Sequence, residues 1–370
     1  MFSTIILFIL VLAGLVFAHE LGHFWVAKKM GMAVEEFGFG FPPKMFGWEK
    51  GGTIYSINWI PLGGFVRIKG ENGILDALAH DSFVAKKIWQ RFLVLIAGVT
   101  MNFLLAAVLL SVGFMFGMPS AIESDMPRGA TVRDPRIEVV SVLAESPAAR
   151  AGVESGDVIL SLNQEMEFFG SDAVRTFIVS RGDSGITLKI KRDGEVLEKT
   201  VSSELLPSVG IRGIGVGLIQ TATVSFPFHL AIWHGFGSAI SLLAEIARVF
   251  ASLLWHLLAQ GRLAADLSGP VGIAVMTGEA ASLGFMSLLQ FTALLSLNLA
   301  VINALPFPAL DGGRIIFLLF EKIRRKSISR MVENFVHNLG FALLMVLIVA
   351  VTYRDVVRFG GGFMKKIFGN

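Results

Sequence analysis

The sequence contains four apolar segments that are each long enough to cross a lipid bilayer. They run from Phe2 to Ala27, from Phe92 to Met118, from Leu283 to Leu305 and from Phe335 to Tyr353. Crossing about 30 Å of hydrocarbon takes about 20 helical residues, because each residue lengthens a helix by about 1.5 Å. Only 16% of the residues are charged, whereas soluble proteins average about 25%. We therefore expect a polytopic α-helical membrane protein with about four transmembrane helices.

Basic residues in the connecting loops predict how these helices are oriented. Lys and Arg are frequent at residues 28–91 and 314–330, and such loops usually lie in the cytoplasm. The long insert at about residues 119–283 is then expected on the outer side. Nothing basic precedes Lys28, so we interpret the apolar N-terminus as a retained helix rather than a cleaved signal peptide.

The chain divides into four predicted parts. Residues 1–118 form an N-terminal membrane region whose cytoplasmic loop carries Gly- and Pro-bounded strand patterns, which predict a membrane-associated β-hairpin. Residues 125–205 predict one inserted α+β domain, with a hairpin turn at Asp193-Gly194. Residues 206–282 predict a linker and a helix at 228–258 that lies along the membrane surface rather than crossing it. Residues 283–370 form the C-terminal membrane region.

A zinc-site pattern lies at the end of the first apolar segment, where His19, Glu20 and His23 fit the pattern H-E-x-x-H. On a helix, positions i and i+4 share one face, so both imidazoles can bind one cation. Glu20 is then placed to act as general base toward water at the metal. Polar groups in an apolar helix are costly and usually functional. The alternative is an interfacial cluster solvated at the headgroups.

Asp311 is the best candidate for the third metal ligand. Pro306 and Pro308 interrupt the third apolar segment shortly before it, because proline lacks the N–H that a helix needs. The first and third segments are both predicted to end at the cytoplasmic side, so Asp311 can reach the histidines. A simple turn at Asp311-Gly312 is the alternative. Asn298 and Asn303 either repair the broken helix or hold substrate.

Together these motifs resemble the site-2 protease family of intramembrane zinc metalloproteases, in its bacterial regulator-of-sigma-E protease branch. The resemblance covers nearly the whole chain. It rests on His19–His23, Pro61–Arg67, Gly98–Phe103, Ser268–Ile273 and Asn303–Gly313.

The resemblance implies one Zn²⁺ per chain, held by His19, His23 and Asp311, with Glu20 catalytic. It implies that Asn298 and Asn303 hold the substrate, and that the substrate adds as a strand beside Gly64, Phe65, Val66 and Arg67. Asn102 matches a family position near the active site, and its role stays open. The inserted domain resembles a PDZ domain, which either gates access or only packs on the helices.

The activity implied is regulated intramembrane proteolysis. The expected substrate is a single-span membrane protein already cut by another protease, of the anti-sigma-factor or signal-peptide-remnant class. The expected location is the bacterial cytoplasmic (inner) membrane, with the active site toward the cytoplasm and the PDZ-like domain outside. A catalytically dormant PDZ scaffold and a transporter with a broken-helix polar site are the alternatives. With no cysteine and a net charge of +3, neither thiolate chemistry nor nucleic-acid binding is expected.

Overall fold

The computed structural model describes residues 2–71, 79–122, 128–163, 170–181, 185–192, 194–206, 210–261, 268–326 and 328–368. Asp193, in the predicted hairpin turn, lies outside this part. The chain forms two compact units. We call Met1–Val112 with Ile232–Asn370 the membrane unit, and Gly113–Ala231 the inserted unit.

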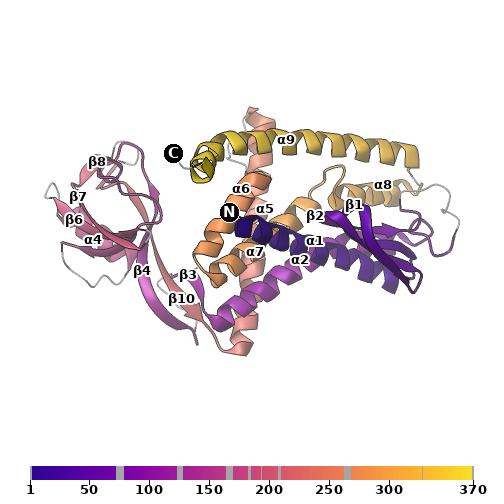
Figure 1. Ribbon diagram of the computed structural model, residues 1–370, viewed down its shortest axis with the longest axis horizontal. Helices are drawn as coiled ribbons and strands as arrows, with labels where there is room; N and C mark the ends of the chain where they lie inside the picture. The colour runs from indigo at the N-terminus through magenta and orange to yellow at the C-terminus, as the bar shows by residue number, and fades with distance from the viewer. Residues whose placement is uncertain are drawn as a thin grey trace. The chain divides into compact units, whose positions relative to one another are not determined.

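The membrane unit is built mainly from long helices (Figure 1). They are α1 (Phe2–Lys29), α2 (Ile88–Phe116), α5 (Phe228–Gln260), α6 (Pro270–Ser282), α7 (Phe285–Ala304), α8 (Asp311–Arg324) and α9 (Arg330–Phe368). α1, α2, α7 and α9 occupy the four predicted apolar segments. The predicted fold class, a helical membrane protein with a β-hairpin and one inserted α+β domain, is confirmed.

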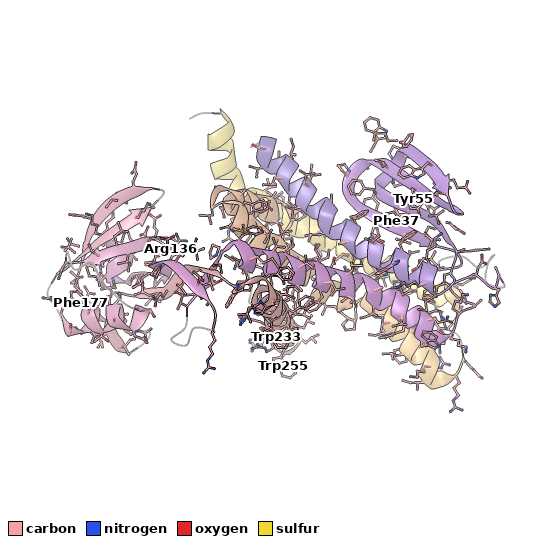
Figure 2. The ribbon with its side chains drawn as sticks, turned by 90° about the horizontal axis from the view of Figure 1, so that it is seen from below. Phe37, Tyr55, Arg136, Phe177, Trp233 and Trp255 are labelled. Carbon is pink, nitrogen blue, oxygen red and sulfur yellow. The ribbon has the colours of Figure 1, made fainter. Side chains whose placement is uncertain are left out.

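α5 covers the segment predicted as a helix along the membrane surface. It is one continuous helix of 33 residues, and within the described part of the chain five helices rather than four have the length and composition of a membrane span. Its charged residues, Glu245 and Arg248, are few, so its mean hydropathy stays high at 1.6. Trp233 and Trp255 project from it and are highly exposed (Figure 2). The predicted count of four spans is therefore approximate.

The hairpin of β1 (Val34–Lys50) and β2 (Thr53–Ile68) curls back on itself. Phe37 pairs with Tyr55 on one side and with Val66 on the other, so the segment at 36–39 is central. The rings of Phe37 and Tyr55 lie 6.3 Å apart (Figure 2). The segment at 64–67 is paired to residues 36–39 on one side and is an edge of this sheet within the described chain.

The inserted unit is an antiparallel α+β structure. Its strands are β3 (Met118–Ala121), β4 (Thr131–Val142), β5 (Val158–Leu162), β6 (Ile186–Arg192), β7 (Glu195–Val201), β8 (Glu204–Leu206), β9 (Ile211–Gly213) and β10 (Val216–Ser225). Its helices are α3 (Pro147–Arg150) and α4 (Ser171–Ser180). Six strands form one sheet in the order β3-β10-β4-β5-β6-β7, and β8 pairs with β9. Alternate apolar residues of β6, including Ile186, Leu188 and Ile190, are buried in its core.

The break between α7 and α8 determines where Asp311 lies. α7 ends at Ala304 and α8 begins at Asp311, with the two prolines between them. Gly312 and Gly313 let the start of α8 approach this segment closely. A Cβ at Gly312 would collide with the carbonyl oxygens of Ala304 and Leu305. The tight approach therefore requires glycine directly after Asp311.

Candidate metal centre

His19 and His23 lie one turn apart on α1, and their side chains meet. Their Nε2 atoms are 3.2 Å apart, and each residue is only 8% exposed. α1 continues past them and ends with Lys28 and Lys29 in its last turn, where basic side chains interact favourably with the helix dipole. Continuous helix through the motif is what keeps both imidazoles on one face.

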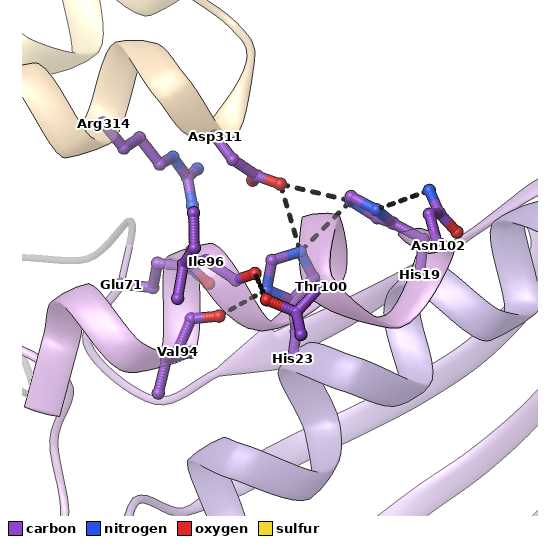
Figure 3. A network of polar contacts seen from close by, with 9 residues as sticks. All are labelled: His19, His23, Glu71, Val94, Ile96, Thr100, Asn102, Asp311 and Arg314. Carbon is purple, nitrogen blue, oxygen red and sulfur yellow. Dashed lines mark hydrogen bonds and ion pairs between the residues drawn. The ribbon is translucent and has the colours of Figure 1, made fainter. Parts of the chain in front are cut away.

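Asp311, the first residue of α8, completes the cluster. Its Oδ2 atom lies 3.2 Å from His19 Nε2 and 3.3 Å from His23 Nε2 (Figure 3). Burial opposes ionisation of the Asp311 carboxyl, but the two imidazoles outweigh burial and hold its pKa below the ordinary range. The carboxyl is therefore an anionic donor between two nitrogen donors.

This donor set fits zinc. The donor atoms of His19, His23 and Asp311 all lie within 4.8 Å of one another. Ligand atoms held at about 2.0–2.2 Å from a tetrahedral zinc ion are about 3.3–3.6 Å apart, close to the spacings found here. The Asp311 Oδ2 atom is buried without a hydrogen-bond partner among the described residues. A cation between the three donors would satisfy it.

Glu20 lies beside the cluster and beside the edge of the hairpin. A Cβ built on Gly64 would lie 3.4 Å from the Cγ atom of Glu20 and 3.6 Å from Cγ1 of Val16. The strand at 64–67 thus passes α1 at the position of the proposed base. A chain paired to this strand edge would run close to the metal cluster.

The remaining predicted substrate residues have different surroundings. Arg67 is paired with Glu36 across the hairpin at 3.2 Å and lies over the Phe65 ring. Asn303 is half-buried in the last turn of α7. Asn298 donates to the Leu294 carbonyl of its own helix at 3.0 Å, and it lines a cavity of about 310 Å³ between α5 and α7. The structure brings the hairpin segment at Gly64 next to Glu20.

α2 contributes contacts to the site that the sequence did not identify, although the family resemblance placed Asn102 near it. The backbone oxygen of Val94 lies 2.8 Å from His23 Nδ1, and Asn102 Nδ2 lies 3.2 Å from His19 Nδ1 (Figure 3). Gly98, between them, packs directly on both imidazoles, and a Cβ there would lie 2.8 Å from His19 Nε2. An amide in an otherwise apolar span is a signal for a buried partner, although it does not identify that partner.

Two further contacts fix the segment that carries Asp311. Arg314, one turn along α8, forms an ion pair with Glu71 (Figure 3). The backbone N–H of Ala309, a non-glycine residue at φ +81°, donates to Nδ1 of His337 on α9 at 3.0 Å. Left-handed backbone of this kind is costly outside glycine and persists only where its surroundings enforce it. α9 thus supports the loop before Asp311.

The chain matches Peptidase family M50 over residues 7–347. It is 38% identical over 354 residues to a protein of Clostridium perfringens (strain 13), an alignment covering 95% of this chain and 98% of that protein. It is 32% identical to the regulator of sigma-W protease RasP of Bacillus subtilis (strain 168), over 96% of this chain and 99% of RasP. The zinc metalloprotease RasP of Geobacillus kaustophilus (strain HTA426) is 31% identical, and the alignment covers 96% of this chain and 98% of that protein.

Among solved structures, the PDZ domain of an SdrC-like protein from Listeria innocua matches 22% of this chain and 92% of its own length, with 24% identity and a TM-score of 0.21. The family match covers most of the chain, and the curated relatives are covered almost end to end. The chain therefore belongs to Peptidase family M50, the site-2 protease family, and is a multi-pass membrane zinc metalloprotease.

Proposed function

We propose that this protein is an endopeptidase that cuts a transmembrane segment of a single-span membrane protein. The observation that carries the proposal is the convergence of His19, His23 and Asp311 on one point at the end of an apolar helix. His19 and His23 would bind one zinc ion through Nε2, and Asp311 would bind it through Oδ2. A zinc ion there supplies Lewis-acid activation of water and of a peptide carbonyl.

Glu20 is the proposed general base. Its carboxylate would accept a proton from the attacking water and then deliver that proton to the leaving amide nitrogen. Its place next to Gly64 supports this role, because a substrate held along residues 64–67 would bring its peptide bonds within reach. No other acidic side chain is needed for the proton transfer.

Gly64 to Arg67 is the proposed substrate-docking edge. A helical substrate has no exposed backbone to attack, so it must unwind near the metal. Pairing with a sheet edge replaces the backbone hydrogen bonds that unwinding breaks. Asn298 and Asn303 are proposed to contact the unwound chain from α7; the half-buried position of Asn303 just before Asp311 supports this better than the position of Asn298 does.

The proposed location is a bacterial cytoplasmic membrane, with the metal centre toward the cytoplasm and the inserted PDZ-like domain outside. The positive loops at 28–91 and 314–330 support this orientation. The proposed substrates are anti-sigma factors or signal-peptide remnants already shortened by another protease. The name of the Bacillus subtilis relative, regulator of sigma-W protease, supports the first class.

The proposal is tested with the full-length protein in liposomes and a model single-span substrate in two forms, one trimmed close to the membrane and one with a folded outer domain. We expect the trimmed form to be cut within its apolar segment, as located by mass spectrometry, and the untrimmed form to be cut more slowly. Cleavage confined to segments outside the apolar stretch would contradict the proposal.

A further inference from the structure

α2 presents three positions, one helical turn apart, to the two histidines of α1. Val94 is next to His23, Asn102 is next to His19, and Gly98 lies between them against both rings. On α1, a Cβ at Gly22 would collide with the carbonyl oxygen of Ala97, so the two helices are in close contact at this level. Each imidazole therefore has its Nδ1 atom facing α2 and its Nε2 atom facing Asp311 (Figure 3).

The partner of each Nδ1 atom dictates where the imidazole carries its proton. The Val94 carbonyl can only accept, so His23 donates through Nδ1–H and its Nε2 lone pair is free for a metal. For His19 the partner is the Asn102 amide, which can either donate or accept. The two orientations of this amide correspond to opposite tautomers of His19.

In the orientation seen here, Asn102 Nδ2 faces His19 Nδ1 and Asn102 Oδ1 is buried without a partner among the described residues. His19 would then carry its proton on Nε2, toward Asp311 Oδ2 at 3.2 Å. That tautomer cannot bind a cation through Nε2. Turning the amide by 180° places Oδ1 on Nδ1 of His19, and this leaves the Nε2 lone pair free.

Asn102 is held firmly enough to exert this control. It is fully buried, and its backbone oxygen accepts a hydrogen bond from the Ser296 hydroxyl of α7 at 2.8 Å. This contact links α2 to α7 at the level of His19. Because the Asn102 side chain has no exposed surface, it acts on the histidine rather than on a substrate.

We propose that Asn102 is a positioning residue for His19: in the metal-loaded protein its Oδ1 atom accepts the His19 Nδ1–H and so fixes Nε2 as the ligand atom. This inference rests on the proposed metal role of His19. Outer partners of metal-binding histidines typically change metal affinity by about 10–100-fold when removed. The effect is expected in metal binding itself and not only in turnover.

The test measures the zinc dissociation constant of the purified full-length protein by competition with a chromophoric chelator. Asn102→Leu, of similar size but without an acceptor, should weaken zinc binding by about 10–100-fold. Asn102→Asp keeps an acceptor oxygen, so its zinc dissociation constant should stay much closer to that of the parent protein. Ser111→Ala is the matched control, because Ser111 is buried on the same helix and bonds only to Ala107 of α2 in the described contacts; its zinc affinity should not change.

The visible spectrum of the Co²⁺-substituted protein gives a second readout. The bands should keep their position in Asn102→Asp and shift or weaken in Asn102→Leu, because the geometry of His19 changes only in the latter. The inference would be overturned if Asn102→Leu bound zinc as tightly as the parent protein. It would also be overturned if Asn102→Leu and Asn102→Asp lost zinc affinity equally. A parent protein that binds no zinc would instead overturn the proposed function, so the two failures are distinguishable.

Discussion

The Nε2 atom of His19 lies 3.2 Å from the Oδ2 atom of Asp311, although one residue belongs to the first helix and the other follows α7. The two prolines before Asp311 end α7, and the two glycines after it let α8 start directly against the end of α7. The local sequence on both sides of Asp311 therefore fixes its place at the start of α8, and the packing of α1 brings His19 to it.

Replacing Asp311 should remove zinc. Asp311→Ala takes away one of three donors, so we expect a larger loss of zinc affinity than the roughly 10–100-fold typical of an outer partner, and loss of cleavage with it. Metal content after dialysis against a chelator checks this. Glu321→Gln is the control, because Glu321 is an acid on the same helix that pairs with Arg91 at 2.9 Å. Full zinc content in Asp311→Ala would rule out the ligand assignment.

A methyl group at Gly98 should disrupt the metal centre. The Cβ of Gly98→Ala would collide with both imidazoles, so one ring must move out of the cluster. Displacing a ligand should cost at least about tenfold in zinc affinity, with helix content unchanged by circular dichroism. Gly14→Ala on α1 is the control, since a Cβ there meets nothing within 4 Å. Unaltered zinc binding by Gly98→Ala would mean that the helices are not packed as described.

A larger side chain at Gly64 should slow cleavage without removing zinc. Gly64→Val would place methyl groups against Glu20 and the Gly38 carbonyl, shifting either the base or the strand edge. Misplacement by about 1 Å costs up to roughly 100-fold in rate. Turnover and metal content measured on the same sample check this. Normal turnover would argue against substrate docking at residues 64–67.

The stability of the inserted unit should depend on pH through Asp157. Burial opposes its ionisation, but hydrogen bonds from Arg192 and from the Glu154 amide outweigh burial and lower its pKa. A lowered folded-state pKa gives stability that is fully present above about pH 4, the unfolded value, and is lost as pH falls through the folded pKa.

Asp157→Asn should therefore destabilise the inserted unit by roughly 1.5–3 kcal/mol near pH 7, because a buried carboxylate loses its charge-assisted hydrogen bonds with Arg192, while Arg192 keeps Glu154 as a partner. The difference in free energy of unfolding between Asp157→Asn and the parent protein should shrink below about pH 4. Hydrogen exchange of β5 amides in the full-length protein measures both effects. Glu204→Gln, which breaks the exposed pair with Arg150, should cost less than about 1 kcal/mol. A pH-independent difference for Asp157→Asn would contradict the account.

Much of this site is predictable because its signals are local. Helical spacing places His19 and His23 on one face, and Pro306 and Pro308 end α7 before Asp311. The position of Asn102 against His19 is not local, because it depends on which face of α2 meets α1. An almost uniformly apolar helix carries no periodic signal for that face. The curled pairing of the hairpin, with Phe37 between two segments of β2, is likewise not local. Pro42, Pro43, Pro61 and Gly63 indicate bends in the two strands, but they do not specify which segments pair.

The most direct test of the central claim compares the parent protein with Glu20→Gln, both reconstituted with a trimmed single-span substrate and both assayed for bound zinc. We predict that Glu20→Gln keeps its zinc and loses about 10²–10⁴-fold in cleavage rate, because only the proton acceptor is removed. Chelation should abolish cleavage by the parent protein, and added zinc should restore it. Cleavage by zinc-loaded Glu20→Gln at the parent rate would contradict the account.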